Sequence, residues 1–130
     1  MQLRQQVNTK DAPAAFGPFS QAIKSNPLVF TSGQLPIDPV SGDIVDQDVE
    51  AQTHRVLKNL EAILNEAGSS LKDVVKATVF ITSMDDFDKV NQIYSTYFSN
   101  PFPARSCIEV PRLAKGAKVE IEAIGLVSGQ

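Results

Sequence analysis

The chain has 130 residues, of which 42% are hydrophobic and 21% are charged, and its formal net charge is −3. This length suits one compact domain over residues 1–130, and the apolar fraction is high enough to build a core, which argues against a disordered chain. The small net charge, with no run of Lys or Arg, argues against nucleic acid as the main partner, because phosphate contacts need clustered positive charge.

Cysteine usage and the apolar pattern bear on the compartment. Cys107 is the only cysteine, so no internal disulfide can form, which fits a reducing compartment. The first residues lack the apolar core of a signal peptide, and no apolar run reaches the ~20 residues needed to span a bilayer. We therefore expect a cytoplasmic protein with no membrane partner. One His and one Cys do not supply the common zinc spacings, so no metal site is expected.

The N-terminal part of the chain predicts short strands separated by loops. A strand is expected at 3–7, an extended segment at 21–24, and a strand rich in β-forming residues at 28–34. Segment 12–20 is rich in Ala, Pro and Gly and is expected to be a loop. Segment 36–46 contains two prolines and a Ser-Gly-Asp turn, which predicts a loop that is partly hairpin-like.

The middle of the chain predicts a helix followed by a strand. Apolar residues recur at helical spacing over 49–67, with Asp48 placed to cap the start and Gly68 placed to end the helix. A strand is expected at 74–82. Its alternate residues are apolar and should face the helices: Val75, Ala77, Val79 and Ile81.

A second helix and two strands complete the predicted elements. Ser83 and Asp86 predict a capping box with Asp in place of Glu at the start of this helix, and the prolines that follow residue 100 end it. The last strands are expected at 104–110 and 117–127, joined by a turn at Lys115-Gly116. The buried stripe of the second helix should comprise Phe87, Val90, Tyr94, Tyr97 and Phe98.

Two helices on one face of a mixed sheet form an α+β two-layer sandwich. The other face of the sheet would then be half polar, because charged residues alternate with apolar ones on three strands. Either a solvent-exposed face or an interface with another subunit fits this pattern. The residues expected on this face are Lys76, Thr78, Phe80, Thr82, Arg105, Cys107, Glu109, Glu120 and Glu122.

Arg105 is the first candidate for chemistry, because an arginine beside apolar strand positions needs a partner. Its planar fork fits a carboxylate held by two parallel hydrogen bonds. That carboxylate could belong to a small acidic ligand, or to one of the glutamates on neighbouring positions. Spacing alone favours the structural ion pair, with Glu109, Glu120 or Glu122.

Five further residues are candidates for a role in binding or chemistry. Glu120 alternates with apolar neighbours, so a raised pKa and a role as general acid or base are open to it, although a solvated strand glutamate is the commoner case. Cys107 is more often a core residue than a nucleophile. Ser32 and Gly33 end a strand, where a hydroxyl and a main-chain N–H could bind an anion or a carbonyl. Phe19, in Gly-Pro-Phe, could carry an aromatic lid.

Six segments of the chain read together as one set of motifs: APAAFGPFSQ at 12–21, TSGQLP at 31–36, KATVFI at 76–81, FDKVN at 87–91, PARSCIEV at 103–110 and VEIEAI at 119–124. In this order they resemble motifs of the reactive intermediate deaminase (RidA/YjgF) family. The likeness is collinear and covers nearly the whole chain, which makes it far more specific than any single motif.

The resemblance implies a homotrimer of chorismate-mutase-like subunits, with the sheets facing the threefold axis and clefts between neighbouring subunits. It also implies hydrolysis of reactive 2-imino acids, such as 2-iminobutanoate and 2-iminopropanoate, and of their enamine tautomers. The products are a 2-keto acid and ammonium, and no metal or organic cofactor takes part. A small imino or carboxylic acid is therefore the expected ligand.

The resemblance also implies roles for individual residues. Arg105 would grip the substrate carboxylate, while Glu120 would activate water and then help to protonate the leaving nitrogen. The surrounding residues would line or support the cleft: Ser32, Gly33, the backbone around Cys107, Phe19 and Asn91.

Phe19 departs from the pattern, since many deaminating members carry Tyr there, and the hydroxyl is lost. Pro111 also departs from it and removes a backbone donor at a strand end, with a local effect expected. The loss at Phe19 leaves a second function open, a non-catalytic 2-keto acid binding or regulatory module. A third, endoribonuclease activity, is reported for some family members, but the net charge of −3 weighs against it.

Overall fold

The computed structural model describes residues 3–128 of the chain. Within this range six strands and two α-helices are joined by loops and three short 3₁₀ turns. In chain order the elements are β1 (Gln5–Val7), β2 (Ala22–Ser25), β3 (Leu28–Thr31), α1 (Val49–Glu66), β4 (Val74–Ile81), α2 (Phe87–Tyr97), β5 (Ala104–Glu109) and β6 (Val119–Leu126).

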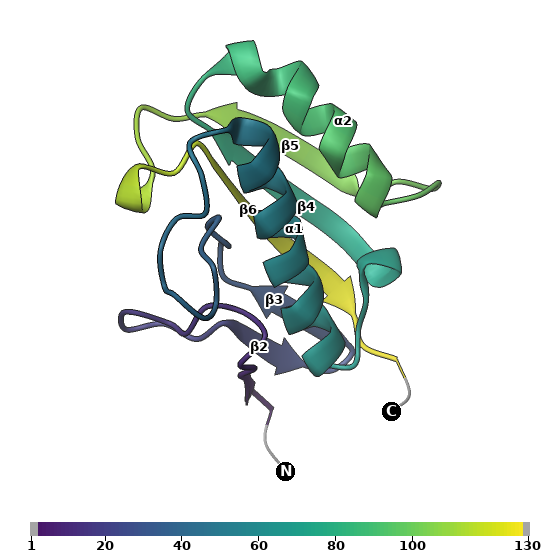
Figure 1. Ribbon diagram of the computed structural model, residues 1–130. Coiled ribbons are helices and arrows are strands. Elements are labelled where there is room, and N and C mark those ends of the chain that lie inside the picture. The colour runs from purple at the N-terminus through teal and green to yellow at the C-terminus, as the bar shows by residue number, and fades with distance from the viewer. Residues whose placement is uncertain (1–2, 129–130) are drawn as a thin grey trace.

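The six strands form one mixed sheet in the order β1-β2-β3-β6-β4-β5. The β4–β5 pair is parallel, which the crossover through α2 allows, and the other pairs are antiparallel. Both helices cross the same face of the sheet (Figure 1). The predicted α+β two-layer sandwich is confirmed.

Helix α1 forms the centre of the core. Its apolar stripe is buried against the sheet, and the side chain of Asp48 accepts a hydrogen bond of 3.0 Å from the N–H of Ala51, as the capping pattern predicted. Gly68 follows the helix with φ +86°, a conformation that favours glycine. The fully buried apolar residues of α1 are Val56, Leu57, Leu60, Ile63 and Leu64.

Strand β4 departs from simple alternation at its start. The pairing with β6 shifts between Val74 and Lys76, so Val75 lies in an irregularity of the ladder. Val75 is 42% exposed, and Val74 takes the buried position instead. The prediction that Val75 faces the helices is therefore wrong, whereas Ala77, Val79 and Ile81 are buried as expected.

The start of α2 also differs from the prediction. Ser83 caps a 3₁₀ turn (Met84–Asp86) by accepting a hydrogen bond from the N–H of Asp85, and α2 begins only at Phe87. Asp86 makes no side-chain capping bond, so the expected capping box is wrong. In the tighter 3₁₀ turn Ser83 accepts from the N–H of Asp85, one residue before the N–H of Asp86 that a capping box would use.

Strand β5 presents its alternate side chains to the opposite face from the one predicted. Its parallel register pairs Arg105, Cys107 and Glu109 with the buried, helix-facing positions of β4. The assignment of these three residues to the half-polar face is therefore wrong. Ser106 and Ile108 lie on that face instead, because side chains in paired positions of adjacent strands point the same way.

The sheet face that no helix covers keeps its mixed character. Glu120 and Glu122 of β6 pair with Phe80 and Thr78 of β4, so they lie on this open face. Large apolar side chains on the same face are about half exposed, namely Phe30, Ile108 and Leu126. Scattered apolar residues are normal on a surface, but a set of them over one sheet face is typical of a protein contact.

Candidate functional site

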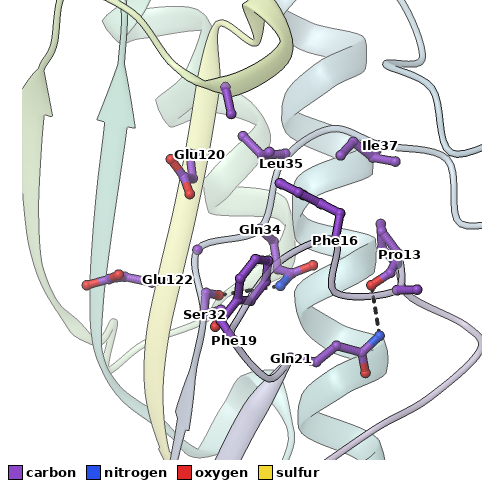
Figure 2. Close-up of a pocket in the computed structure, with 13 residues that line it drawn as sticks. Pro13, Phe16, Phe19, Gln21, Ser32, Gln34, Leu35, Ile37, Glu120 and Glu122 are labelled. Carbon is purple, nitrogen blue, oxygen red and sulfur yellow. Dashed lines mark hydrogen bonds between the residues drawn. The ribbon is translucent and has the colours of Figure 1, made fainter.

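A pocket of about 370 Å³ opens where the loop before β2 folds over the segment after β3 and over β6 (Figure 2). Three stretches that are far apart in the sequence therefore meet at one place. Its polar side chains come from Gln21 before β2, from the segment after β3 and from β6. The lining residues are Pro13, Ala14, Phe16, Phe19, Gln21, Ser32, Gly33, Gln34, Leu35, Ile37, Ala114, Glu120 and Glu122.

The side chain of Glu120 lies against Gly33. A methyl group built on Gly33 would stand only 2.8 Å from Cδ of Glu120, so the carboxylate needs the glycine. Burial, with the negative charge of Glu122 as the smaller cause, raises the pKa of Glu120 above its ordinary value of about 4.5. A raised pKa is the direction expected of a carboxyl group that acts as a general acid or base.

Ser32 and Gly33 are fixed by main-chain bonds on both sides. The N–H of Ser32 donates to the carbonyl of Gln21 at 2.9 Å, and the N–H of Gln34 donates to the carbonyl of Ile121 at 2.8 Å. Between them, the N–H of Gly33 donates to no acceptor among residues 3–128. A fixed donor beside a carboxyl group is suited to polarising a bound carbonyl or imine.

Gln21 holds the loop that carries the aromatic residues. Its buried side chain accepts from the N–H of Thr9 at 2.8 Å and donates to the carbonyl of Pro13 at 2.8 Å. The next part of this loop presents Phe16 and Phe19, whose rings pack edge to face with centroids 5.3 Å apart. Phe19 therefore stands at the pocket, as the glycine-proline-aromatic motif led us to expect.

Arg105 is held on the other face of the sheet, beneath α2. Its Nη1 donates to Oδ1 of Asn91 at 2.7 Å, and its guanidinium lies 4.9 Å from the ring centroid of Tyr94 and 5.8 Å from that of Phe87. No ion pair joins it to a glutamate within residues 3–128. Of the expected structural partners, Glu109 accepts instead from the N–H of Met84.

The two residues expected to carry the chemistry do not meet within one chain. Arg105 pairs with Ala77, which faces the helices, whereas Glu120 pairs with Phe80 on the open face. Asn91 accompanies Arg105, so it too is separate from the pocket. Cys107 also lies on the helix side, packs against the core, and has its pKa raised by burial, which disfavours the nucleophile reading.

Several lining residues were not singled out from the sequence. Phe16, Leu35, Ile37 and Gln34 enter the pocket because their loops return onto β6, a long-range arrangement that no local spacing shows. Glu122 was expected on the half-polar face together with Glu120, because residues two apart on a strand share a face, and was also considered as a partner for Arg105. It was not predicted to be a pocket residue, yet it lines the pocket and acts on Glu120.

The described residues offer neither a metal cluster nor a membrane-spanning helix. Residues 3–128 hold no cluster of three or more His, Cys, Asp or Glu side chains arranged to bind a metal ion. None of the helices in that range is long and apolar enough to cross a membrane.

Known proteins resemble this chain over nearly its whole length. The family model described as endoribonuclease L-PSP matches residues 9–127. A RutC family protein of Sinorhizobium fredii is 52% identical over 91% of this chain and 94% of its own. A 2-iminobutanoate/2-iminopropanoate deaminase of Salmonella typhimurium is 46% identical over 92% of this chain and 95% of its own. The structure of E. coli TdcF with bound serine has 41% identity and a TM-score of 0.90, over 95% of this chain and 99% of TdcF.

Proposed function

Because this chain belongs to the endoribonuclease L-PSP family, which includes the RidA deaminases, we propose that it hydrolyses reactive 2-imino acids to 2-keto acids and ammonium. The substrates would include 2-iminobutanoate, 2-iminopropanoate and their enamine tautomers. Two relatives named for this deaminase support the proposal, one from Salmonella typhimurium and one from Mus musculus that is 44% identical.

The observation that carries this proposal is the half-buried Glu120 beside Gly33. A carboxyl group with a raised pKa, next to a fixed main-chain N–H, supplies a proton acceptor and a hydrogen-bond donor around one small volume. Hydrolysis of an imine needs little more, because a protonated imine is already electrophilic. Positioning and one proton shuttle are enough.

The substrate carboxylate needs a cation, and we propose that Arg105 of a second copy supplies it. In one chain the sheet separates Arg105 from Glu120, so a complete site requires the open face of one copy to meet the β5 edge of the next. A ring of three copies in head-to-tail contact would form three equal sites. The exposed Phe30, Ile108 and Leu126 would then be covered.

The proposed reaction proceeds in two stages on Glu120. Water attacks the iminium carbon while the carboxylate of Glu120 takes one of its protons, which gives a carbinolamine. The protonated Glu120 then returns this proton to the amino nitrogen. The C–N bond breaks as the hydroxyl oxygen forms the C=O bond, and the hydroxyl proton leaves through Glu120 to convert ammonia into ammonium.

The guanidinium group of Arg105 has N–H donors free to bind the substrate carboxylate during these steps. The bond to Asn91 uses one hydrogen of Nη1, and the guanidinium has five N–H donors, so four remain, of which a bidentate carboxylate contact needs two. The aromatic rings of Tyr94 and Phe87 hold its plane.

A second candidate is a 2-keto acid binding module without turnover. Phe19 favours it, because a phenyl ring offers the pocket an aromatic surface without a hydroxyl group to bind water or substrate. Nuclease activity is less well supported by the pocket, because its only charged lining residues among those described are Glu120 and Glu122, which repel phosphate.

Complementation between two inactive variants tests the proposal. Arg105→Ala and Glu120→Gln should each abolish the acceleration of 2-iminobutanoate hydrolysis, with the imine generated by a threonine dehydratase. When the two are unfolded together and refolded in equal amounts, about one quarter of the sites should combine an intact Arg105 with an intact Glu120. Recovery of about that share of activity supports a site built from two copies.

The other outcomes are equally informative. No recovery, with mixed oligomers shown by native mass spectrometry, would mean that both residues act within one chain. A single variant that keeps its activity would show that the residue it lacks is not required. Wild-type protein that binds 2-ketobutyrate but does not accelerate the loss of imine would replace the deaminase by the binding module.

A further inference from the structure

The pocket beside Glu120 has two chemically different ends. Glu120 and Glu122 lie along β6 at one end, whereas Ile37 and Pro13 lie at the other, with Phe16 between them (Figure 2). The proposed reaction uses only the polar end. The apolar end is therefore available to the part of a substrate that does not react.

The floor of the apolar end is rigid. Leu35 and Ile37 are only 6% and 3% exposed, and they pack in a small cluster of their own with Ala117. The buried side-chain amide of Asn59 donates to both of their carbonyls, at 3.1 Å and 2.9 Å. Because α1 carries Asn59, the floor is tied to the core and cannot readily move.

The wall opposite this floor is less firmly held. Phe16 is 59% exposed, although it lines the pocket. Its ring contacts the edge of Phe19, and the ammonium of Lys115 lies 5.6 Å from its centroid. Two weak contacts of this kind orient a ring without burying it. A rigid apolar floor facing an orientable aromatic wall is suited to holding a short alkyl chain.

We propose that Phe16 sets the substrate range, by packing the substrate's side chain against the floor of Leu35 and Ile37. This rests on the proposed function and adds its substrate class: 2-imino acids with unbranched apolar side chains. Each methylene enclosed there should raise kcat/KM about fourfold, which corresponds to about 0.8 kcal/mol. A side chain ending in a carboxylate is disfavoured by burial and by the charges of Glu120 and Glu122.

A series of imines tests the proposal directly. The imines of alanine, 2-aminobutyrate, norvaline and glutamate are generated by amino-acid oxidases, and kcat/KM is measured by competition with semicarbazide. In the wild type kcat/KM should rise about fourfold per added methylene, and the glutamate imine should be at least about tenfold poorer than that of norvaline. In Phe16→Ala the rise with chain length should largely vanish, while Phe16→Leu should keep part of it.

The matched control is Val40→Ala, which also shortens an exposed apolar side chain. Val40 is 94% exposed in the turn at 38–43, outside the pocket, so this variant should keep the wild-type dependence on chain length. Circular dichroism should show all three variants folded, because neither position is buried. An equal slope in wild type and Phe16→Ala would overturn the proposal. Preference for the glutamate imine, lost in Lys115→Met, would also overturn it and assign the wall to an acidic side chain.

A series of binding measurements distinguishes failure of the proposed deaminase function from failure of the proposed role of Phe16. If no imine is hydrolysed, the affinities of pyruvate, 2-ketobutyrate and 2-ketovalerate are measured by calorimetry on the same variants. The same dependence on chain length and on Phe16 would support the apolar end without a reaction. A flat series, or no binding by any of the three acids, would overturn it.

Discussion

The substitution Gly33→Ala tests the contact between Gly33 and the carboxylate of Glu120. The new methyl group would lie 2.8 Å from Cδ of Glu120 and 3.1 Å from its Cγ, which is closer than side chains tolerate. The Glu120 side chain is half-buried and flexible, so it can swing away, and the fold should lose at most about 1 kcal/mol. The carboxylate, however, is displaced by about 1 Å, and a misplacement of that size costs about 100-fold in rate.

The matched control is Gly125→Ala, on the strand β6 that also carries Glu120. Its methyl group would lie 2.8 Å from Oγ of Ser69 and 3.4 Å from Cδ2 of Leu64, on the helix side of the sheet. Leu64 is fully buried and cannot move away, so overpacking should cost about 1–3 kcal/mol of stability. The site is far from this contact along β6, and the activity of the folded fraction should be unchanged.

The assay compares imine hydrolysis and thermal unfolding at one protein concentration, because the proposed assembly would make the melting temperature depend on concentration. Gly33→Ala should lose about 100-fold in kcat/KM with little change in melting temperature. Gly125→Ala should melt several degrees lower, at about 3–4 °C per kcal/mol for a chain of this size, and stay active. Near-normal activity in Gly33→Ala would refute the role of Glu120, unless the carboxylate is shown to keep its place.

Two further predictions concern charge at the site. Burial is the larger cause of the raised pKa of Glu120 and the negative charge of Glu122 is the smaller one. Glu122→Gln removes only the smaller cause, so the acidic limb of kcat/KM should move part of the way to lower pH; an unmoved limb would assign it to another group. The folded state binds a proton on Glu120 more tightly than the unfolded state does, because its pKa is raised in the fold. The contribution of Glu120 to the free energy of unfolding therefore increases as the pH falls through this raised pKa, whereas that of a salt-bridged carboxyl decreases. Asn91→Asp should raise KM about tenfold with a smaller change in kcat, because a carboxylate beside Arg105 competes with the substrate. A KM equal to that of Asn91→Ala would contradict this competition.

Helix α1 could be predicted from local pattern because its stripe, its cap and its terminal glycine agree with one another. The start of β4 could not, because Val74 and Val75 are both apolar and alternation allows either to face inward. Pairing with β6 decides between them by placing the irregularity at Val75. Such a choice depends on a strand nearly fifty residues away, which local spacing does not contain.

The orientation of strand β5 also could not be predicted from local spacing, and it determines which face of the sheet carries Arg105. Its sequence, ARSCIE, places Arg105, Cys107 and Glu109 on one face and Ala104, Ser106 and Ile108 on the other. Neither face is uniformly apolar, so periodicity does not show which one turns toward the helices. The register with β4 and the aromatic rings of α2 determine which side Arg105 occupies. The family resemblance gave Arg105 and Glu120 roles at one site, but only the sheet's geometry separates them within a chain.

The partner of Arg105 shows why this separation suits a site for carboxylates. A guanidinium on the same face as Glu120 and Glu122 would pair with them, and at about 4 Å and an effective dielectric of 20 each contact would be worth about 4 kcal/mol. A substrate would first have to displace that pairing. Asn91 instead accepts one hydrogen bond through a neutral amide, which fixes the guanidinium and leaves its charge uncompensated. The cation–π contact with Tyr94 has the same effect, since a ring orients the cation without neutralising it. Within one chain the sheet thus keeps the cation from the carboxylates, and in the proposed site a second copy would bring them to either side of a ligand.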